Sequence, residues 1–245
     1  MTLFRILAFV ALALPALSGS PLKTKLSTES ARAYDDYVKG AEAGFDCRGH
    51  VPTAGHGVKV IPGSLNPTIE LPDAIIHDWV AAELVRDVTV EQVLRVLQSY
   101  SNYARLFAPE IADSKVYSHH DNEWKIYLKL HKRAILTANL DTEYNVEYRC
   151  LGEGRWAMLS HSTKVAEVED GVVLPVGTGH GFLWRLNAYW MLEQRPEGVY
   201  IECRAISMSR DVPAGFGWAL RGVVARLPRE SLRDTLESTA RALKQ

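Results

Sequence analysis

Hydrophobic and polar residues alternate along the chain from Lys115 to Arg210, and clusters of turn-forming residues interrupt this alternation. A period of two is typical of β-strands that bury one face. The short spacing between the alternating segments is that of hairpins, which join neighbouring antiparallel strands. We therefore expect a series of long antiparallel strands in this part of the chain. The expected turns are His119–Asn122, Gly152–Gly154, Asp170–Gly171 and Arg195–Gly198.

The residues before this region change period twice. Ile75–Asp87 alternates and predicts a first strand. An apolar stripe at helical spacing follows over residues 90–97, and Thr89 before it is a suitable N-terminal cap. We expect a helix there that reaches about Tyr100, followed by a second short helix or turn over residues 102–107.

The chain ends in another helical pattern, with Leu232, Leu236 and Ala240 on one face. Pro228 suits the first turn of such a helix, where its missing N–H removes no hydrogen bond. The apolar face of the helix needs a partner, which a curled sheet supplies. We therefore expect an α+β fold, with a curved antiparallel sheet of six to seven strands wrapped around a long C-terminal helix.

Residues 1–18 have the features of a signal peptide. Arg5 precedes an apolar run over Ile6–Leu14, and small residues follow around Ser18. The run is shorter than the roughly 20 residues that a membrane-spanning helix needs. We expect the segment to be removed on export to the periplasm or beyond, which leaves no stable membrane span.

Residues 19–74 are expected to form an N-terminal extension of the main domain, residues 75–245. Within the extension, Ser27–Glu42 is polar with apolar positions at helical spacing, and predicts a short amphipathic helix outside the main core. Gly44–Pro72 contains several Gly and Pro residues, which interrupt regular secondary structure. The segment therefore predicts a loop with one or two edge-strand fragments.

The composition excludes several classes of protein. Apolar residues make up 47% of the chain and charged residues 23%, which is ordinary for a globular protein and argues against a multispanning membrane protein. The net charge is -1 and basic residues are scattered among acids, so we expect no nucleic-acid partner. Cys47, Cys150 and Cys203 are an odd number, which leaves at least one thiol without a partner in the same chain. The sequence does not indicate the oligomeric state.

Three groups of residues are typical of one known family of folds. They are Thr89–Val93 with Ser101–Tyr103 and Phe107–Pro109, Tyr200–Arg204 with Ser207–Pro213, and Leu227–Leu232. Together with the order of strand, two short helices, long antiparallel strands and terminal helix, they resemble the START-like (SRPBCC) superfamily, which includes polyketide cyclases and birch-pollen-allergen-like proteins. The resemblance covers about Ile75–Lys244 and looks like the exported bacterial branch. It implies a helix-grip fold around an apolar cavity, but not one function, since the superfamily includes carriers, lipid-transfer proteins and cyclases.

Residues of the expected strands are candidates for ligand contacts. Aromatic side chains on the concave face would line an apolar pocket, although strand aromatics are also ordinary core residues. Glu202 and Arg204 share one strand face and can lie opposite Tyr189. On the concave face this polar patch would orient the polar head of a ligand, and on the convex face it would be a solvated ion-pair surface. The candidate ligand-binding residues are Trp124, Tyr144, Trp184, Tyr189, Trp190, Glu202, Arg204 and Trp218.

The sequence shows no catalytic or metal-binding signature. His77 and Asp78 are neighbours in a strand and point to opposite faces, so they do not form an acid–base pair. His119–Asp121 has metal-binding residue types but fits an exposed turn. Arg210 and Asp211 either border the mouth of the cavity, with Phe216–Trp218 as a mobile lid, or Arg210 simply fixes the turn into the last helix, which is the favoured interpretation. We expect neither a metal nor a cofactor.

Three functions remain under consideration. The leading hypothesis is non-catalytic binding of a hydrophobic small molecule or lipid in the cavity between the sheet and the C-terminal helix. The second is an enzyme of the cyclase or dehydratase type that uses Glu202, Arg204 and Tyr189 as acids and bases in the same cavity. The third is an interaction module with a collapsed cavity, in which residues 27–72 bind a protein partner.

Overall fold

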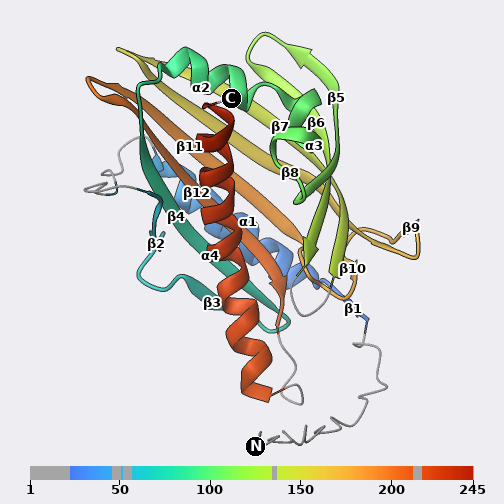
Figure 1. The fold of residues 1–245 in the computed structure, drawn as a ribbon. Coiled ribbons are helices and arrows are strands. Elements are labelled where there is room, and N and C mark those ends of the chain that lie inside the picture. Colours follow the sequence, from blue (N-terminus) through green and yellow to red (C-terminus); the bar gives the residue numbers. More distant parts are fainter. Residues whose placement is uncertain (1–22, 46–50, 52–56, 134–136, 212–216, 245) are drawn as a thin grey trace, which may run out of the picture.

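One large antiparallel sheet lies between helices on its two faces (Figure 1). The signal peptide expected at residues 1–18 lies outside the part of the chain that the structure describes. The computed structural model describes residues 23–45, 51, 57–133, 137–211 and 217–244.

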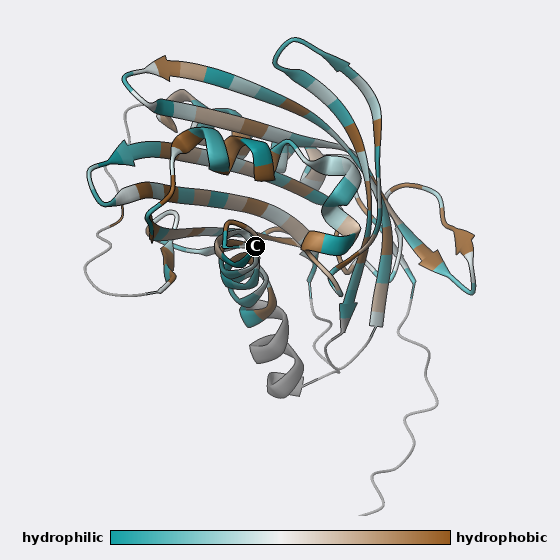
Figure 2. Cartoon of the chain, turned by 45° about the horizontal axis from the view of Figure 1, so that its top comes forward, coloured by the Kyte–Doolittle hydropathy of each residue, from teal (hydrophilic) through white to brown (hydrophobic). Residues whose placement is uncertain are grey.

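The sheet has ten strands, and all its paired strands are antiparallel. Its main path runs in the order β2-β4-β12-β11-β8-β7-β6-β5, with β3 also paired to β4 and β9 to β8. Hydrophobic and hydrophilic residues alternate along the strands, as the period of two predicts (Figure 2). The strands are β2 (Lys59–Pro62), β3 (Thr68–Glu70), β4 (Ala74–Arg86), β5 (Ile111–His120), β6 (Glu123–Arg133), β7 (Thr137–Gly152), β8 (Arg155–Glu169), β9 (Val172–Val173), β11 (Arg185–Arg195) and β12 (Gly198–Arg210).

The expected α+β architecture and antiparallel sheet are confirmed, but the strand count is higher than six to seven. Part of the difference in strand number arises at β6 and β7, which are two strands where the alternating pattern continues without a break. They pair with Arg133 opposite Thr137. The sequence between these residues is Ala-Ile-Leu and contains no Gly, Pro, Asn or Asp. The usual signal for a hairpin is therefore missing, and the alternating pattern continues through the reversal. Two further short strands, β1 (Thr24–Lys25) and β10 (Thr178–Gly179), pair with each other.

The C-terminal helix α4 spans Gly217–Ala242 and lies on the concave face of the sheet, mainly against β4 and β12 (Figure 1). The expectation that Pro228 lies in its first turn is wrong, because the helix begins eleven residues earlier and Pro228 is inside it. Leu232, Leu236 and Ala240 are buried against the sheet, as their spacing predicts.

Three short helical segments close one end of the concave face. α2 (Val90–Leu97) begins with a capping box in which the Thr89 side chain and Gln92 satisfy each other's backbone N–H groups. The turn η2 (Tyr100–Asn102) and helix α3 (Tyr103–Leu106) follow, as expected from the sequence. Their apolar side chains share one hydrophobic core with α4 and the concave residues of the sheet.

Helix α1 (Thr28–Ala43) covers the opposite, convex face of the sheet (Figure 1). Its N-terminus is tied to the start of β4, because the Asp73 carboxylate accepts hydrogen bonds from the Ser27 backbone N–H and from the Ser27 and Ser30 hydroxyls. Tyr34 is 2% exposed and donates a hydrogen bond to the Ile206 carbonyl oxygen. The helix was expected outside the core, but it forms a second core with the convex face.

The segment between α1 and β4 also belongs to the sheet. β2 and β3 are the edge-strand fragments expected in the loop, and both pair with β4. Residues from the expected N-terminal extension therefore cover one face of the main sheet and supply two of its strands.

Candidate functional site

Several apolar side chains on the concave face remain partly exposed. They surround the buried core beneath α4, and they lie on strands at both sides of the curved sheet. Burying such surface under an apolar molecule is favourable because it removes apolar area from water. The partly exposed concave residues are Trp79 on β4, Ala205 on β12, Leu186 and Ala188 on β11, and Trp124 and Leu128 on β6.

Three of the sequence-predicted residues face this side of the sheet. Trp124, Tyr144 and Trp190 all belong to the concave core or pack against it. Trp124 is partly exposed, whereas Tyr144 and Trp190 are 4% and 5% exposed. The structure therefore brings these three to one face, and Trp124 is the most exposed of them.

A buried pair of tyrosines lies close to Trp124. The Tyr100 and Tyr148 hydroxyl oxygens are 2.7 Å apart and hydrogen bonded. The Tyr100 ring centroid is 5.2 Å from that of Trp124. Burial raises the pKa of both tyrosines well above the ordinary value, so both hydroxyls are neutral at physiological pH.

A second polar group of the concave face is His77 on β4. It is 1% exposed, and its Nε2 is 3.2 Å from the Ser209 hydroxyl oxygen. Its Nδ1 is buried and has no hydrogen-bond partner. The indole N–H groups of Trp79 and Trp124 are likewise buried without a partner. Such groups are rare in proteins, and each costs about 1–3 kcal/mol when unsatisfied.

A pocket of about 450 Å³ lies where the end of α4 meets α2 and α3. Leu106 and Leu243 line it and also pack against the concave core. Arg95 and Arg105 line the same pocket. The pocket therefore joins a basic surface to the edge of the apolar core.

The remaining predicted strand residues face the other side of the sheet. Tyr189 and Trp184 belong to the convex core beneath α1. Glu202 and Arg204 alternate with the concave residues Ile201 and Cys203, and so share the convex face. Their placement in the cavity is therefore wrong. The alternative of a convex ion-pair surface has the right face, but this surface is buried rather than solvated, because Glu202 is 3% and Arg204 8% exposed.

Arg204 and Asp78 form a buried ion pair on the convex face. Arg204 donates from Nε to Asp78 Oδ1 at 2.9 Å and from Nη2 to Asp78 Oδ2 at 2.6 Å. The Tyr37 hydroxyl of α1 donates to the same carboxylate at 2.6 Å. A side chain at Gly63 would collide with this carboxylate, so glycine is required there. The pair therefore joins β12, β4 and α1.

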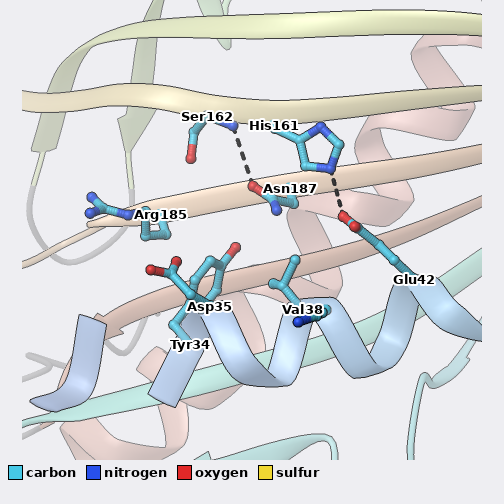
Figure 3. Close-up of a pocket in the computed structure, with 9 residues that line it drawn as sticks. Tyr34, Asp35, Val38, Glu42, His161, Ser162, Arg185 and Asn187 are labelled. Carbon is cyan, nitrogen blue, oxygen red and sulfur yellow. Dashed lines mark hydrogen bonds and ion pairs between the residues drawn. The ribbon is translucent and has the colours of Figure 1, made fainter. Parts of the chain in front are cut away.

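A pocket of about 290 Å³ lies between α1 and strands β8 and β11 (Figure 3). Glu42 Oε1 bridges two side chains of the sheet, and lies 2.6 Å from His161 Nε2 and 2.7 Å from the Tyr189 hydroxyl. Asn187 donates to the same hydroxyl at 3.1 Å. These hydrogen bonds fasten the C-terminal turns of α1 to the sheet.

Comparison with solved structures bears on the arrangement of the elements. A STAR-related lipid transfer protein from Xanthomonas axonopodis superposes with a TM-score of 0.52 and 18% identity, over 80% of this chain and 98% of that one. The chain has a START-like fold. Human STARD10 gives a TM-score of 0.48 at 11% identity, over 88% of this chain and 81% of that one. The di-domain ARO/CYC StfQ from the steffimycin biosynthetic pathway gives 0.47 at 13% identity, over 69% and 50%. No family model and no curated protein matches the sequence.

Other sequence candidates have local partners in this START-like fold. His119 stacks on Trp124 with ring centroids 3.5 Å apart, and His120 pairs with Asp121 at 3.0 Å. His77 and Asp78 point to opposite faces, as expected. Trp218 lies in the first turn of α4 rather than in a loop, and its side chain is outside the described part, as are Phe216 and Cys47.

Sequence reasoning did not identify the polar groups of the concave face of the START-like sheet. His77 was considered only together with Asp78, and Trp79 only as part of an alternating strand. Parity within β4 was a usable signal, because residues 77, 79 and 81 must share a face. The partner Ser209 was not accessible in this way, since it lies 132 residues further along the chain.

We predict that His77 makes the stability of the START-like fold depend on pH. Burial lowers the pKa of His77 to about 4, from an ordinary value of 6.5. Between these values the unfolded chain binds a proton that the folded chain does not, so unfolding becomes easier as the pH falls. The loss reaches about 3 kcal/mol at pH 4. Urea unfolding of the wild type and of His77→Gln at several pH values should show this extra slope in the wild type only. Parallel profiles would contradict it.

We also predict that removing one partner of the Arg204–Asp78 pair lowers the free energy of unfolding more than removing both partners does. Arg204→Met leaves a buried, unpaired carboxylate and should lower the free energy of unfolding by about 3–5 kcal/mol. Arg204→Met combined with Asp78→Leu removes both charges and should recover a large part of that loss. Denaturant unfolding measures Arg204→Met, Asp78→Leu and the double variant. A double variant as unstable as the sum of the two single variants would show that the charges do not act as a pair.

Proposed function

We propose that this protein binds a hydrophobic small molecule or lipid on the concave face of its sheet, beside α4. The observation that carries the proposal is the set of partly exposed apolar residues on that face, including Trp79, Trp124, Ala188 and Ala205. They lie next to a fully buried core, so a bound apolar molecule would extend that core rather than create a new one. The START-like fold is compatible with such a role.

A carrier function is favoured over a cyclase or dehydratase acting through the residues first considered. Glu202, Arg204 and Tyr189 all lie on the convex face and are hydrogen bonded to protein groups there. They are separated from the concave face by the sheet itself, and thus do not supply acids or bases to a ligand bound on that face.

An interaction module based on the N-terminal segment is also less well supported. α1, β2 and β3 are packed against or paired with the sheet, so their apolar residues are used inside the protein. A partner that bound these apolar residues would first have to displace them.

Export is part of the proposal and rests on the leader-like sequence at residues 1–18. In the described residues, no helix is long and apolar enough to cross a membrane. Cell fractionation that finds the protein in the cytoplasm with its leader intact would remove export from the proposal while leaving ligand binding untouched.

We predict that a large side chain at Ala188 blocks binding. Ala188 is partly exposed on the concave face, so Ala188→Phe places a ring where the ligand would lie. Binding of the fluorescent probe anilinonaphthalene sulfonate should weaken about tenfold or more, a change of about 1.4 kcal/mol. Ala112→Phe is the matched control, because Ala112 is an exposed strand residue of β5.

Thermal unfolding of both variants separates blocked binding from misfolding. The proposed function fails if folded Ala188→Phe binds the probe as well as the wild type, or if extraction and mass spectrometry find no apolar compound and no lipid or aromatic compound stabilises the wild type.

A further inference from the structure

The C-terminal ends of α2, α3 and α4 lie close together at one end of the molecule. α4 contacts both of the other helices, and its last residues lie beside them (Figure 1). The pocket of about 450 Å³ described above is formed at this point. Sites for small molecules have volumes of about 300–1,000 Å³, so the pocket is large enough to hold one.

One side of this pocket is apolar. Leu106 and Leu243 line it, are partly buried, and pack against the concave core. Val96 and Ala242 are also partly buried lining residues. An alkyl group that covered these side chains would remove apolar area from water, which is favourable.

The other side of the pocket is basic. Arg95 and Arg105 line it and are exposed, and neither forms a hydrogen bond or an ion pair with another described residue. Arg241 and Lys244, which flank the two lining residues at the end of α4, are exposed as well. Four positive charges therefore lie in or beside the pocket, although the net charge of the chain is -1.

The helix ends explain the sign of these charges but leave their hydrogen-bond donors unused. Arg95, Arg105 and Arg241 each lie in the last turn of a helix, where the helix dipole favours a basic side chain. Glu91, one turn before Arg95, is exposed and does not line the pocket. None of the described lining residues is acidic, so no carboxylate within the pocket competes for the two lining guanidinium groups.

We propose that this pocket binds a phosphate monoester that carries an apolar chain. The planar donors of Arg95 and Arg105 match the oxygens of a phosphate group, and the chain lies against Leu106 and Leu243. A phosphate monoester has a charge of about −1.5 to −2 at pH 7, which suits four nearby cations better than a single negative charge does. The site goes beyond the proposed function and does not depend on it, since Ala188 and Ala205 do not line this pocket in the described part of the chain.

Calorimetric titration of the purified full chain with octyl phosphate, kept monomeric, tests this proposal. Octanol has the same chain without the charge, octanesulfonate has a single charge, and inorganic phosphate has no chain. Vesicles of phosphatidylcholine with and without phosphatidic acid test whether the phosphate monoester must instead be part of a membrane.

The variants are Arg95→Gln, Arg105→Gln and Ala242→Phe, of which the last fills the pocket with a ring. Arg32→Gln is the matched control for the arginines, because Arg32 is exposed on α1. Ala43→Phe is the control for Ala242→Phe, because Ala43 ends α1 as Ala242 ends α4. Thermal unfolding shows that each variant is folded.

Octyl phosphate should bind the wild type about tenfold or more tightly than octanol or inorganic phosphate, and more tightly than octanesulfonate. Arg95→Gln and Arg105→Gln should each weaken its binding about threefold to tenfold, because the lost hydrogen bonds are charged but exposed. Ala242→Phe should weaken it at least about tenfold, and both controls should stay within about twofold of the wild type.

Three results would overturn the inference. The first is octanol binding as tight as that of octyl phosphate, or folded Arg95→Gln and Arg105→Gln proteins that bind like Arg32→Gln. The second is binding to vesicles with phosphatidic acid but to no monomeric ester, which would indicate a membrane contact instead of a pocket. The third is loss of octyl phosphate binding in folded Ala188→Phe, which would place the compound on the concave face and support the proposed function alone.

Discussion

The central strands of this sheet are buried on both faces, and the rest of the molecule follows from that constraint. In β12, Ile201 and Cys203 lie in the concave core, while Ile206 and Met208 lie in the convex core. A strand of this kind must be covered on both sides, as in sheets with helices on two faces. α4 and α2 cover one side, and α1 covers the other. The N-terminal segment is therefore needed to keep the convex face of the sheet dry.

Both faces of the sheet bury polar groups. The convex face holds the buried ion pair of Asp78 and Arg204 and the hydrogen bond between Glu42 and His161. Among the described residues, the indole N–H groups of Trp79 and Trp124 on the concave face and of Trp184 in the convex core are buried without a protein acceptor. An unpaired charge is costly to bury, but a neutral donor is satisfied by a single acceptor atom.

The sequence was sufficient to predict the strands, because alternation gives the parity of every residue within a strand. It did not divide the candidate aromatic residues between the faces: Trp124, Tyr144 and Trp190 lie with the concave core, and Trp184 and Tyr189 with the convex core. Parity does not say which of two apolar faces meets the helix, and for this reason both the concave and the convex placement stay open for Glu202 and Arg204 in the sequence. The partner that decides their role, Asp78, lies 126 residues from Arg204 in the chain. Likewise, Pro228 suggested a helix start, since nothing local showed that the helix already begins at Gly217.

The most direct test of a ligand site on the concave face is a methyl NMR spectrum of the alanine-labelled protein with a spin-labelled stearate. Ala188 and Ala205 carry their methyl groups on the concave face, and Ala157 and Ala74 carry theirs in the convex core. A paramagnetic label broadens the signals of nearby methyl groups only. We predict that the signals of Ala188 and Ala205 broaden and are restored by an excess of unlabelled ligand, while those of Ala157 and Ala74 persist. Broadening of the convex pair alone would contradict the account.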